Sequence, residues 1–234
     1  MLIKPWNEGT APRHFFEDDT ENVEIPEIIV PEVSGDSILI IPSSLKILGD
    51  FEKKEVGEIV IKYKQVEELD VKDYDEDEQL YNAMKSVKYP NYNIPIYKFN
   101  GNIVIIIPHI SNTIVINKLS EALVSLKFEN WITLSPSNIP LSLNKVGTMD
   151  FNVPPMKPPH FITGISASIN SNLYKKGKKF VGLVLRGEGQ PGFEIIDGDA
   201  MVDVAYILES HFKIDLVKHV SAKVRKFTYS GMYI

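Results

Sequence analysis

Residues 94–107 read IPIYKFNGNIVIII, and this stretch decides the fold. Two apolar segments, 94–99 and 102–107, are separated by Asn100 and Gly101, the dipeptide that forms tight turns between antiparallel strands. The second segment is apolar at nearly every position, so both of its faces must be buried. We therefore expect a hairpin whose second strand lies in the centre of a sheet, with helices covering it on both sides.

Three further segments predict strands of the same sheet. Residues 37–42 (SILIIP) form an apolar run typical of a buried strand, and residues 58–64 (EIVIKYK) alternate like a half-exposed one. Residues 179–185 (KFVGLVL) predict another strand, between two segments with helical periodicity. Strands and helices therefore alternate through the C-terminal half, which favours some parallel pairing.

Three segments repeat apolar residues at helical spacing and predict amphipathic helices. They are residues 113–127, with Ser111 and Asn112 as candidate caps, residues 159–174, with a proline in the first turn, and residues 200–212, capped by Asp199. Their apolar stripes are Ile116, Leu119, Leu123 and Leu126 in the first, Phe161, Ile165, Ile169 and Leu173 in the second, and Met201, Val204, Ala205, Leu208 and Phe212 in the third.

These elements predict an α/β fold, a three-layer α/β/α sandwich with a mixed central sheet. Residues 1–34 mix prolines with acids and isolated apolar residues, which indicates an extended N-terminal arm. Residues 35–228 form the single α/β domain, and the acidic stretch within it, residues 67–78, is expected to be a mobile loop because its charges repel one another. Residues 229–234 are expected to form a flexible C-terminal tail.

Composition excludes several classes of protein. The 234 residues include no cysteine, which removes disulfide scaffolds, thiol nucleophiles and zinc knuckles together. A net charge of −6 disfavours nucleic acid as a partner. The first residues, MLIKPWN, lack the apolar stretch of a secretory signal, and the longest apolar run, residues 103–107, is too short to cross a bilayer. We therefore expect a cytoplasmic protein that does not insert into membranes, with the nucleus as a further location.

The motifs typical of catalytic, cofactor-binding or metal-binding sites are incomplete in this sequence. Gly187, Gly189 and Gly192 match the glycine spacing of dinucleotide-binding loops, but no helix opens directly after them, so we expect a structural loop. Ser166 lies in GISAS, which lacks the second glycine of a nucleophile elbow. The five histidines show no spacing that could hold a metal, and the acidic stretch lacks the glycine of a calcium loop. We predict no catalytic, cofactor-binding or metal-binding residues.

The C-terminal residues, YSGMYI, suggest a docking segment. Ser230 and Gly231 provide flexibility, and Met232, Tyr233 and Ile234 follow as an apolar residue, a tyrosine and the terminal carboxylate. A matching groove could recognise the aromatic ring, the hydroxyl group and the carboxylate together. We therefore predict that Met232, Tyr233 and Ile234 bind a partner protein.

Four blocks carry a resemblance to a known family: MLIKPWN at the start, PPHFITG at 158–164, GEGQPGFE at 187–194 and GMYI at the end. In this order they resemble fungal proteasome assembly chaperones, and among these subunit one of the heterodimeric α-ring chaperone. The resemblance implies a fold similar to phosphorylase and hydrolase-like sandwiches without their catalytic residues, and no cofactor.

The same resemblance implies the partners. A related second subunit would complete a heterodimer that caps the outer face of the α-ring of the 20S core particle. Met232, Tyr233 and Ile234 match the hydrophobic-Tyr-any tail that family members insert between neighbouring α subunits, where the carboxylate meets a pocket lysine. Occupied pockets would guide ring assembly and keep regulators from docking too early.

Two alternatives stay open at this point. The first is a hydrolase or phosphorylase-like enzyme of the same fold, because fold alone does not settle function. Detectable hydrolysis of generic substrates would favour it. The second is a proteasome activator that uses the same tail, and peptidase assays on latent core particles distinguish it from a chaperone.

Overall fold

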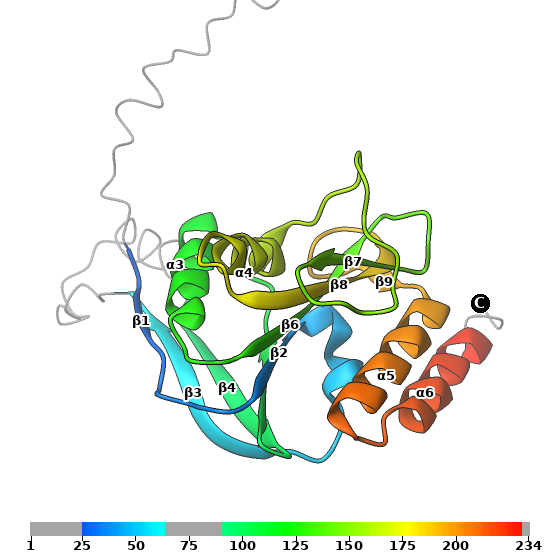
Figure 1. The fold of residues 1–234 in the computed structure, drawn as a ribbon, viewed down its shortest axis with the longest axis horizontal. Coiled ribbons are helices and arrows are strands. Elements are labelled where there is room, and N and C mark those ends of the chain that lie inside the picture. Colours follow the sequence, from blue (N-terminus) through cyan, green and yellow to red (C-terminus); the bar gives the residue numbers. More distant parts are fainter. Residues whose placement is uncertain (1–24, 64–89, 231–234) are drawn as a thin grey trace, which may run out of the picture.

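The computed structural model describes residues 25–63 and 90–230, which form a mixed sheet between two layers of helices (Figure 1). The strands are β1 Glu27–Ile29, β2 Ser37–Pro42, β3 Lys54–Lys62, β4 Tyr92–Phe99, β5 Asn102–Ile107, β6 Asn130–Ser137, β7 Leu143–Gly147, β8 Lys179–Glu188 and β9 Ile195–Ile196. The helices are the 3-10 helix η2 Ser43–Gly49 and the α-helices α3 Thr113–Val124, α4 Gly164–Lys175, α5 Gly198–Phe212 and α6 Val217–Ser230.

The sheet has a parallel centre and antiparallel margins. Its strand order is β1-β3-β4-β5-β2-β6-β8-β7, and β9 pairs with β8 outside this path. β2 is parallel to both of its neighbours, β5 and β6, and β6 is parallel to β8. The remaining pairs are antiparallel. Residues 38–41 of β2 are fully buried, because a strand in the centre of the sheet has helices on both faces.

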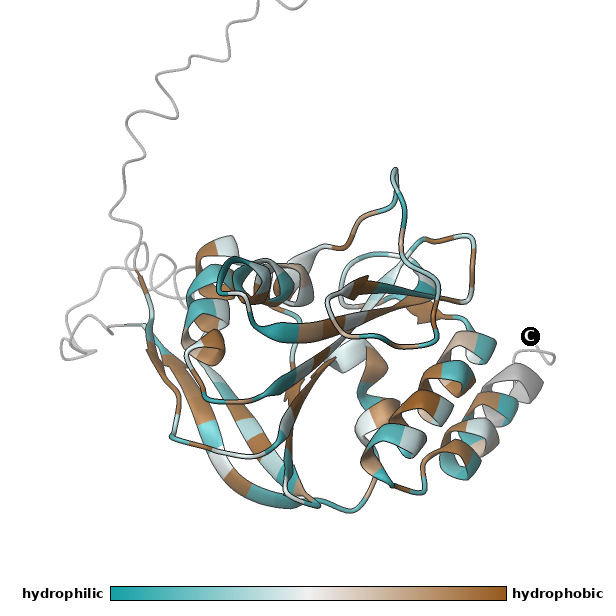
Figure 2. Ribbon diagram, viewed as in Figure 1, coloured by the Kyte–Doolittle hydropathy of each residue, from teal (hydrophilic) through white to brown (hydrophobic). Residues whose placement is uncertain are grey.

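Alternate residues of the central strands enter two separate cores. Ile38 and Ile40 of β2 pack on the face covered by α3 and α4, whereas Leu39 and Ile41 pack on the face covered by η2, α5 and α6. Figure 2 shows hydrophobic residues along the strands and alternating hydrophobic and hydrophilic bands on α5 and α6. The described residues therefore form the predicted three-layer α/β/α sandwich with a mixed sheet.

The predicted hairpin is confirmed. Asn100 and Gly101 both have positive φ, 43° and 79°, as a two-residue hairpin turn of type I′ requires. β5 lies inside the sheet, between β4 and β2, as expected from its apolar sequence. The strand at 37–42 has the predicted bounds, while β3 begins and ends earlier than residues 58–64, and β8 continues three residues beyond residue 185.

The first and third predicted helices are confirmed, with one correction. Asn112 caps α3, since its Oδ1 accepts hydrogen bonds from the backbone N–H groups of Ile114 (2.9 Å) and Val115 (3.4 Å). α5 begins at Gly198, and its cap is Asp197, not Asp199. The Asp197 carboxylate accepts a hydrogen bond from the Asp199 backbone N–H, so Asp199 already belongs to the first turn.

The start predicted for the second helix is wrong. α4 begins at Gly164, because the backbone before it is held away from helical geometry: Thr163 is extended (φ −129°, ψ 178°). The Ser137 hydroxyl donates to the Phe161 carbonyl at 2.8 Å, which fixes this approach to β6. Phe161 is therefore outside the helix and 69% exposed, although Ile165 and Ile169 of the predicted stripe are buried.

Several elements were not predicted. β6, β7 and α6 are absent from the sequence-based assignment, and β1, which pairs with β3, lies inside the segment predicted as an arm. α6 includes residues 229 and 230, which were assigned to the tail. The acidic stretch 67–78, residues 1–24 of the arm and residues 231–234 lie outside the described residues. Within the described ranges, no helix is both long and apolar enough to cross a membrane.

Candidate functional site

The last described helix, α6, leads directly to the predicted docking residues. It ends at Ser230, so Gly231 alone separates it in the sequence from Met232. Met232, Tyr233 and Ile234 themselves lie outside the described residues. The structure therefore describes the helix that precedes the docking residues. The contacts of α6 with the rest of the domain decide how firmly this helix is held.

The start of α6 is capped by a side chain of α5. Glu209 Oε2 accepts hydrogen bonds from the backbone N–H groups of Leu216 (3.0 Å) and Val217 (2.9 Å). Such groups at a helix start have no partner within the helix, so a carboxylate there both caps the chain and complements the helix dipole. The hydrogen bonds from Val217 and Leu216 lower the pKa of Glu209. The cap therefore stays ionised at neutral pH and links α5 to α6.

One face of α6 is apolar and packs on the domain. Val220 and Leu216, the residue just before the helix, are fully buried, and Val224 contacts the same core from a half-buried position. Gly198, the first residue of α5, lies so close that an added Cβ would be 2.6 Å from Val224 Cγ1. Figure 1 shows α5 and α6 side by side at one end of the molecule. This close approach requires glycine at the start of α5.

A cluster of polar side chains joins the same helix to the end of η2, which lies on the same face of the sheet. His219 Nε2 donates to Asp50 Oδ2 at 2.9 Å, and the Lys223 ammonium donates to the same oxygen. His219 and Lys223 are four residues apart and so share one face of α6, while Asp50 directly follows η2. Hydrogen bonds from Lys223 and then His219 lower the pKa of Asp50. We call these three residues the Asp50 clamp.

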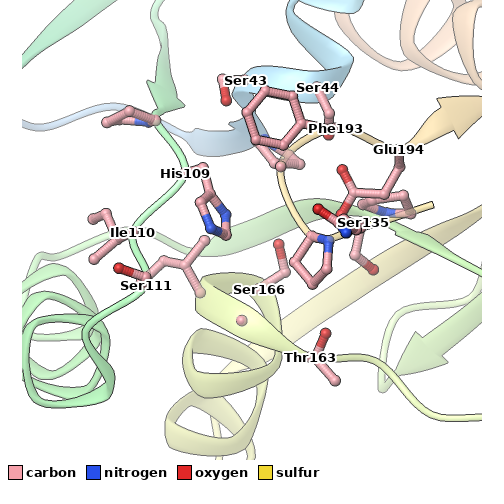
Figure 3. Close-up of a pocket in the computed structure, with 18 of the residues that line it drawn as sticks. Ser43, Ser44, His109, Ile110, Ser111, Ser135, Thr163, Ser166, Phe193 and Glu194 are labelled. Atoms are coloured by element: carbon pink, nitrogen blue, oxygen red, sulfur yellow. The ribbon is translucent and has the colours of Figure 1, made fainter.

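A second feature is a cavity of about 560 Å³ at the carboxyl ends of the parallel strands. Its walls are the residues that follow β2 and β5, the end of β6, the first turn of α4 and the loop 190–194 between β8 and β9 (Figure 3). The chain leaves β2 toward one face of the sheet and β5 toward the other, because η2 and α3 lie in different cores. Ligands of open α/β sheets bind at such positions.

The polar groups of this cavity are not arranged as a nucleophile and base. The Ser166 hydroxyl is buried and donates to the Leu134 carbonyl at 2.7 Å, so it is used in packing α4 on β6, as expected from its place inside a helix. Ser135 Oγ and Glu194 Oε2 are buried without a hydrogen-bond partner. Among the described lining residues, no hydrogen bond joins His109 to a hydroxyl or a carboxylate.

No helix opens directly after the glycine motif, as predicted. β8 and β9 pair through Gly187 and Ile196, and α5 begins only at Gly198, after this second strand. Gly189 and Gly192 have positive φ, 126° and 87°. An added Cβ on Gly192 would be 2.5 Å from His109 Cγ, so the loop closes against that ring. In the parts of the chain that the structure describes, no group of three or more His, Asp or Glu could hold a metal ion.

Of all these features, the sequence singled out Ser166, the glycine loop and the terminal residues, and the role of the terminal residues stays a prediction. The Asp50 clamp was missed because Asp50 is 169 residues from His219 and 173 residues from Lys223 in the sequence. The cavity was missed because it is formed by segments from five elements. A signal existed for α6 alone, in the spacing of Leu216, Val220 and Val224 at every fourth residue.

Comparison with known proteins gives one family match. A family model described as POC1 chaperone matches residues 1–234. No curated protein sequence matches the chain significantly.

Solved structures share the fold at low sequence identity. Pyrococcus furiosus PbaA, an archaeal homolog of proteasome-assembly chaperone, has a TM-score of 0.60 and 13% identity, over 90% of this chain and 92% of that one. Pyrococcus furiosus PbaB, an archaeal proteasome activator, has a TM-score of 0.54 and 9% identity, over 88% of this chain and 97% of that one. A PAC2 family protein from Streptomyces avermitilis has a TM-score of 0.50 and 12% identity, over 85% and 96%.

Proposed function

The chain belongs to the POC1 chaperone family, and from that premise we propose that it is a non-enzymatic chaperone of 20S proteasome assembly. It acts in the cytoplasm as a heterodimer with a related subunit. Met232, Tyr233 and Ile234 bind between α subunits on the outer face of the α-ring, and their binding blocks premature docking of regulators. The observation that carries the proposal is a family match over the whole chain, residues 1–234.

The anchoring of α6 supports a tail-based mechanism. A short flexible segment is costly to order, at about 1–2 kcal/mol per residue, and burial of one Met and one Tyr returns only a few kcal/mol at roughly 25 cal/mol per Å². A single tail should therefore bind weakly. A helix fixed by Glu209 and the Asp50 clamp limits the positions that the following residues can sample. A second tail on the partner subunit would raise the effective concentration of both.

Tail truncation tests this proposal. We expect that deletion of residues 232–234, or Tyr233→Ala, reduces capture of core particles by the immobilised heterodimer while the two subunits still co-purify. The matched control is Tyr174→Ala, which removes a tyrosine that is 73% exposed on α4. Equal capture by the truncated, Tyr233→Ala and control proteins would refute the tail mechanism.

A proteasome activator is the second candidate, because the fold is shared with PbaB, an archaeal proteasome activator. An activator and a chaperone could use the same tail, so binding alone does not separate them. The rate of peptide hydrolysis by latent core particles distinguishes an activator from a chaperone. We expect the heterodimer to leave this rate nearly unchanged, whereas a severalfold increase that depends on Tyr233 would favour activation.

The enzyme alternative rests on fold and on the strand-end cavity. Catalysis there would need an activated nucleophile, and Ser166 already donates its hydroxyl proton to a backbone carbonyl. We propose that the chain has no hydrolase activity. Turnover of ester or peptide substrates by the pure protein, abolished by Ser166→Ala, would overturn this part of the proposal.

A further inference from the structure

The side of α6 that faces away from the domain carries cations. Lys218, Ala222 and Arg225 are exposed, and their spacing of four and three residues places them on one side of the helix. Val220 and Val224 lie on the opposite side and pack on the domain. In Figure 1, α6 is the outermost helix at this end of the molecule, beside α5. We call Lys218, Ala222 and Arg225 the outer face of α6, and it is the side that another protein can contact.

The charge of α6 differs from that of the chain. Residues 217–230 include four Lys or Arg residues and no Asp or Glu, although the chain has a net charge of −6. Two carboxylates elsewhere in the domain offset part of this charge. Asp50 pairs with Lys223, and Glu209 interacts with Lys218 through its charge. The charge that remains lies toward the C-terminal half of the helix.

Arg225 is a cation of the outer face that no carboxylate of the described residues binds. The start of α5 lies close to this part of α6, since an added Cβ on Gly198 would be 2.6 Å from Val224 Cγ1. Two acids are found there, but the Asp197 carboxylate caps α5, and neither Asp197 nor the exposed Asp199 forms an ion pair with Arg225. A guanidinium binds a carboxylate strongly and with defined geometry. Arg225 is therefore available for a carboxylate of a partner.

The docking residues bring the outer face close to the protein that they bind. Met232 follows Ser230 by two residues, so their Cα atoms are at most about 7 Å apart. Arg225 precedes Ser230 by five residues, or about 8 Å along the helix axis. A protein that holds Met232 in a groove therefore has its surface next to the last turns of α6. Charges on that surface act on Arg225, because physiological salt screens exposed charges only beyond about 8 Å.

We propose that the outer face of α6 is a second contact with the docking partner, and that this partner presents an acidic surface beside the groove for residues 232–234. The inference rests on the proposed function and names the chemistry of the α-ring surface that the chain recognises. Residues 232–234 fill a groove, and the outer face adds a charged contact next to it. Opposite charges across an interface raise the association rate and fix the orientation of the two proteins. A groove with basic surroundings would repel α6, so the outer face also selects among similar grooves.

Charge changes at Arg225 test the proposal in the intact heterodimer, with biolayer interferometry on purified core particles. We expect Arg225→Glu to weaken binding roughly tenfold, mainly through slower association, and Arg225→Gln to weaken it roughly threefold. The difference between Arg225→Glu and the unmodified chain should shrink as salt is raised from about 0.05 M to about 0.5 M, because salt screens the contact. The matched control is Lys175→Glu, the same change of charge at an exposed residue of α4, on the other face of the sheet. Thermal unfolding confirms that each variant is folded.

Tyr233→Ala, measured beside these variants, separates this proposal from the proposed function. Weakened binding of Tyr233→Ala, with Arg225→Glu equal to the control, would overturn the acidic contact and leave the tail mechanism intact. Weakened binding of Arg225→Glu, with Tyr233→Ala unchanged, would refute the tail mechanism and support a contact through the outer face. A loss in Arg225→Glu that is the same at every salt concentration would overturn the proposal. Failure of Arg225→Glu to co-purify with the second subunit would overturn it as well, since it would place the outer face inside the heterodimer.

Discussion

Loss of the Asp50 clamp should weaken the attachment of α6 while the rest of the fold remains. We consider Asp50→Asn, which keeps the shape of the side chain and removes the charge that His219 and Lys223 share. The apolar contacts of Leu216 and Val220 are untouched by this change. The variant therefore isolates the charged contribution to the position of α6.

The size of the stability loss follows from how exposed the three side chains of the Asp50 clamp are. The side chains of Asp50, His219 and Lys223 are 53%, 40% and 39% exposed, so solvent screens both contacts. An exposed contact of this kind contributes about 0.2–1 kcal/mol, so the two together contribute about 0.4–2 kcal/mol. For a chain of this length, that loss lowers Tm by roughly 1–8 °C if unfolding is global. If α6 opens separately, its amide hydrogen exchange accelerates roughly 2–30-fold and Tm changes less.

The effect must also depend on pH in one direction. Because the pKa of Asp50 is lowered in the folded chain, its contribution is present above its ordinary value of about 4 and is lost as pH falls through the lowered value. Thermal melts and hydrogen exchange at pH 7 and through a series of acidic pH values provide the assay. Asp150→Asn is the control, since Asp150 pairs with Lys145. Identical α6 exchange in Asp50→Asn and the unmodified chain at pH 7 would show that the Asp50 clamp does not stabilise α6.

Three further predictions concern the same elements. Gly198→Val should place a side chain against Val224 and destabilise the chain by about 1–3 kcal/mol, measured by urea unfolding; an unchanged midpoint would show that α6 is not packed as described. Glu209→Gln should lower Tm at pH 7, and this loss should shrink as the pH falls through the lowered pKa of Glu209, because the stabilisation by the carboxylate is lost there; a loss that stays the same throughout an acidic pH series would contradict this. Gly192→Ala should strain the loop against His109 and at a φ of +87°, destabilising by about 1–2 kcal/mol or more; a melt identical to that of the unmodified chain would exclude this close contact.

Local sequence signals predicted the centre of the fold. The Asn100-Gly101 turn and the apolar residues 102–107 carried enough information to place a hairpin and a buried strand. β6 gave a weaker signal, because Pro136 and two serines interrupt its sequence, NWITLSPS. α4 was placed too early because proline at a first turn suits a helix start, while the contact from Ser137 to Phe161 that overrides this preference joins distant segments.

α6 shows why the site was harder to predict than the fold. Its sequence, VKHVSAKVRKFTYS, is rich in basic residues and has a narrow apolar stripe. Its polar contacts are made to Glu209 at its start and to Asp50, far away in the chain. Contacts of this kind depend on tertiary structure and leave no local pattern. The docking residues themselves were recognised from composition and order, and they stay a prediction.

The affinity of the heterodimer for purified core particles tests the central proposal most directly. It should be measured by biolayer interferometry for the unmodified chain and for a chain with a few Gly and Ser residues added after Ile234, which moves the carboxylate without changing any existing residue. We expect the extension to weaken binding roughly tenfold or more, because a charge-assisted contact is lost. Equal affinities of the two proteins would contradict docking through a free terminal carboxylate.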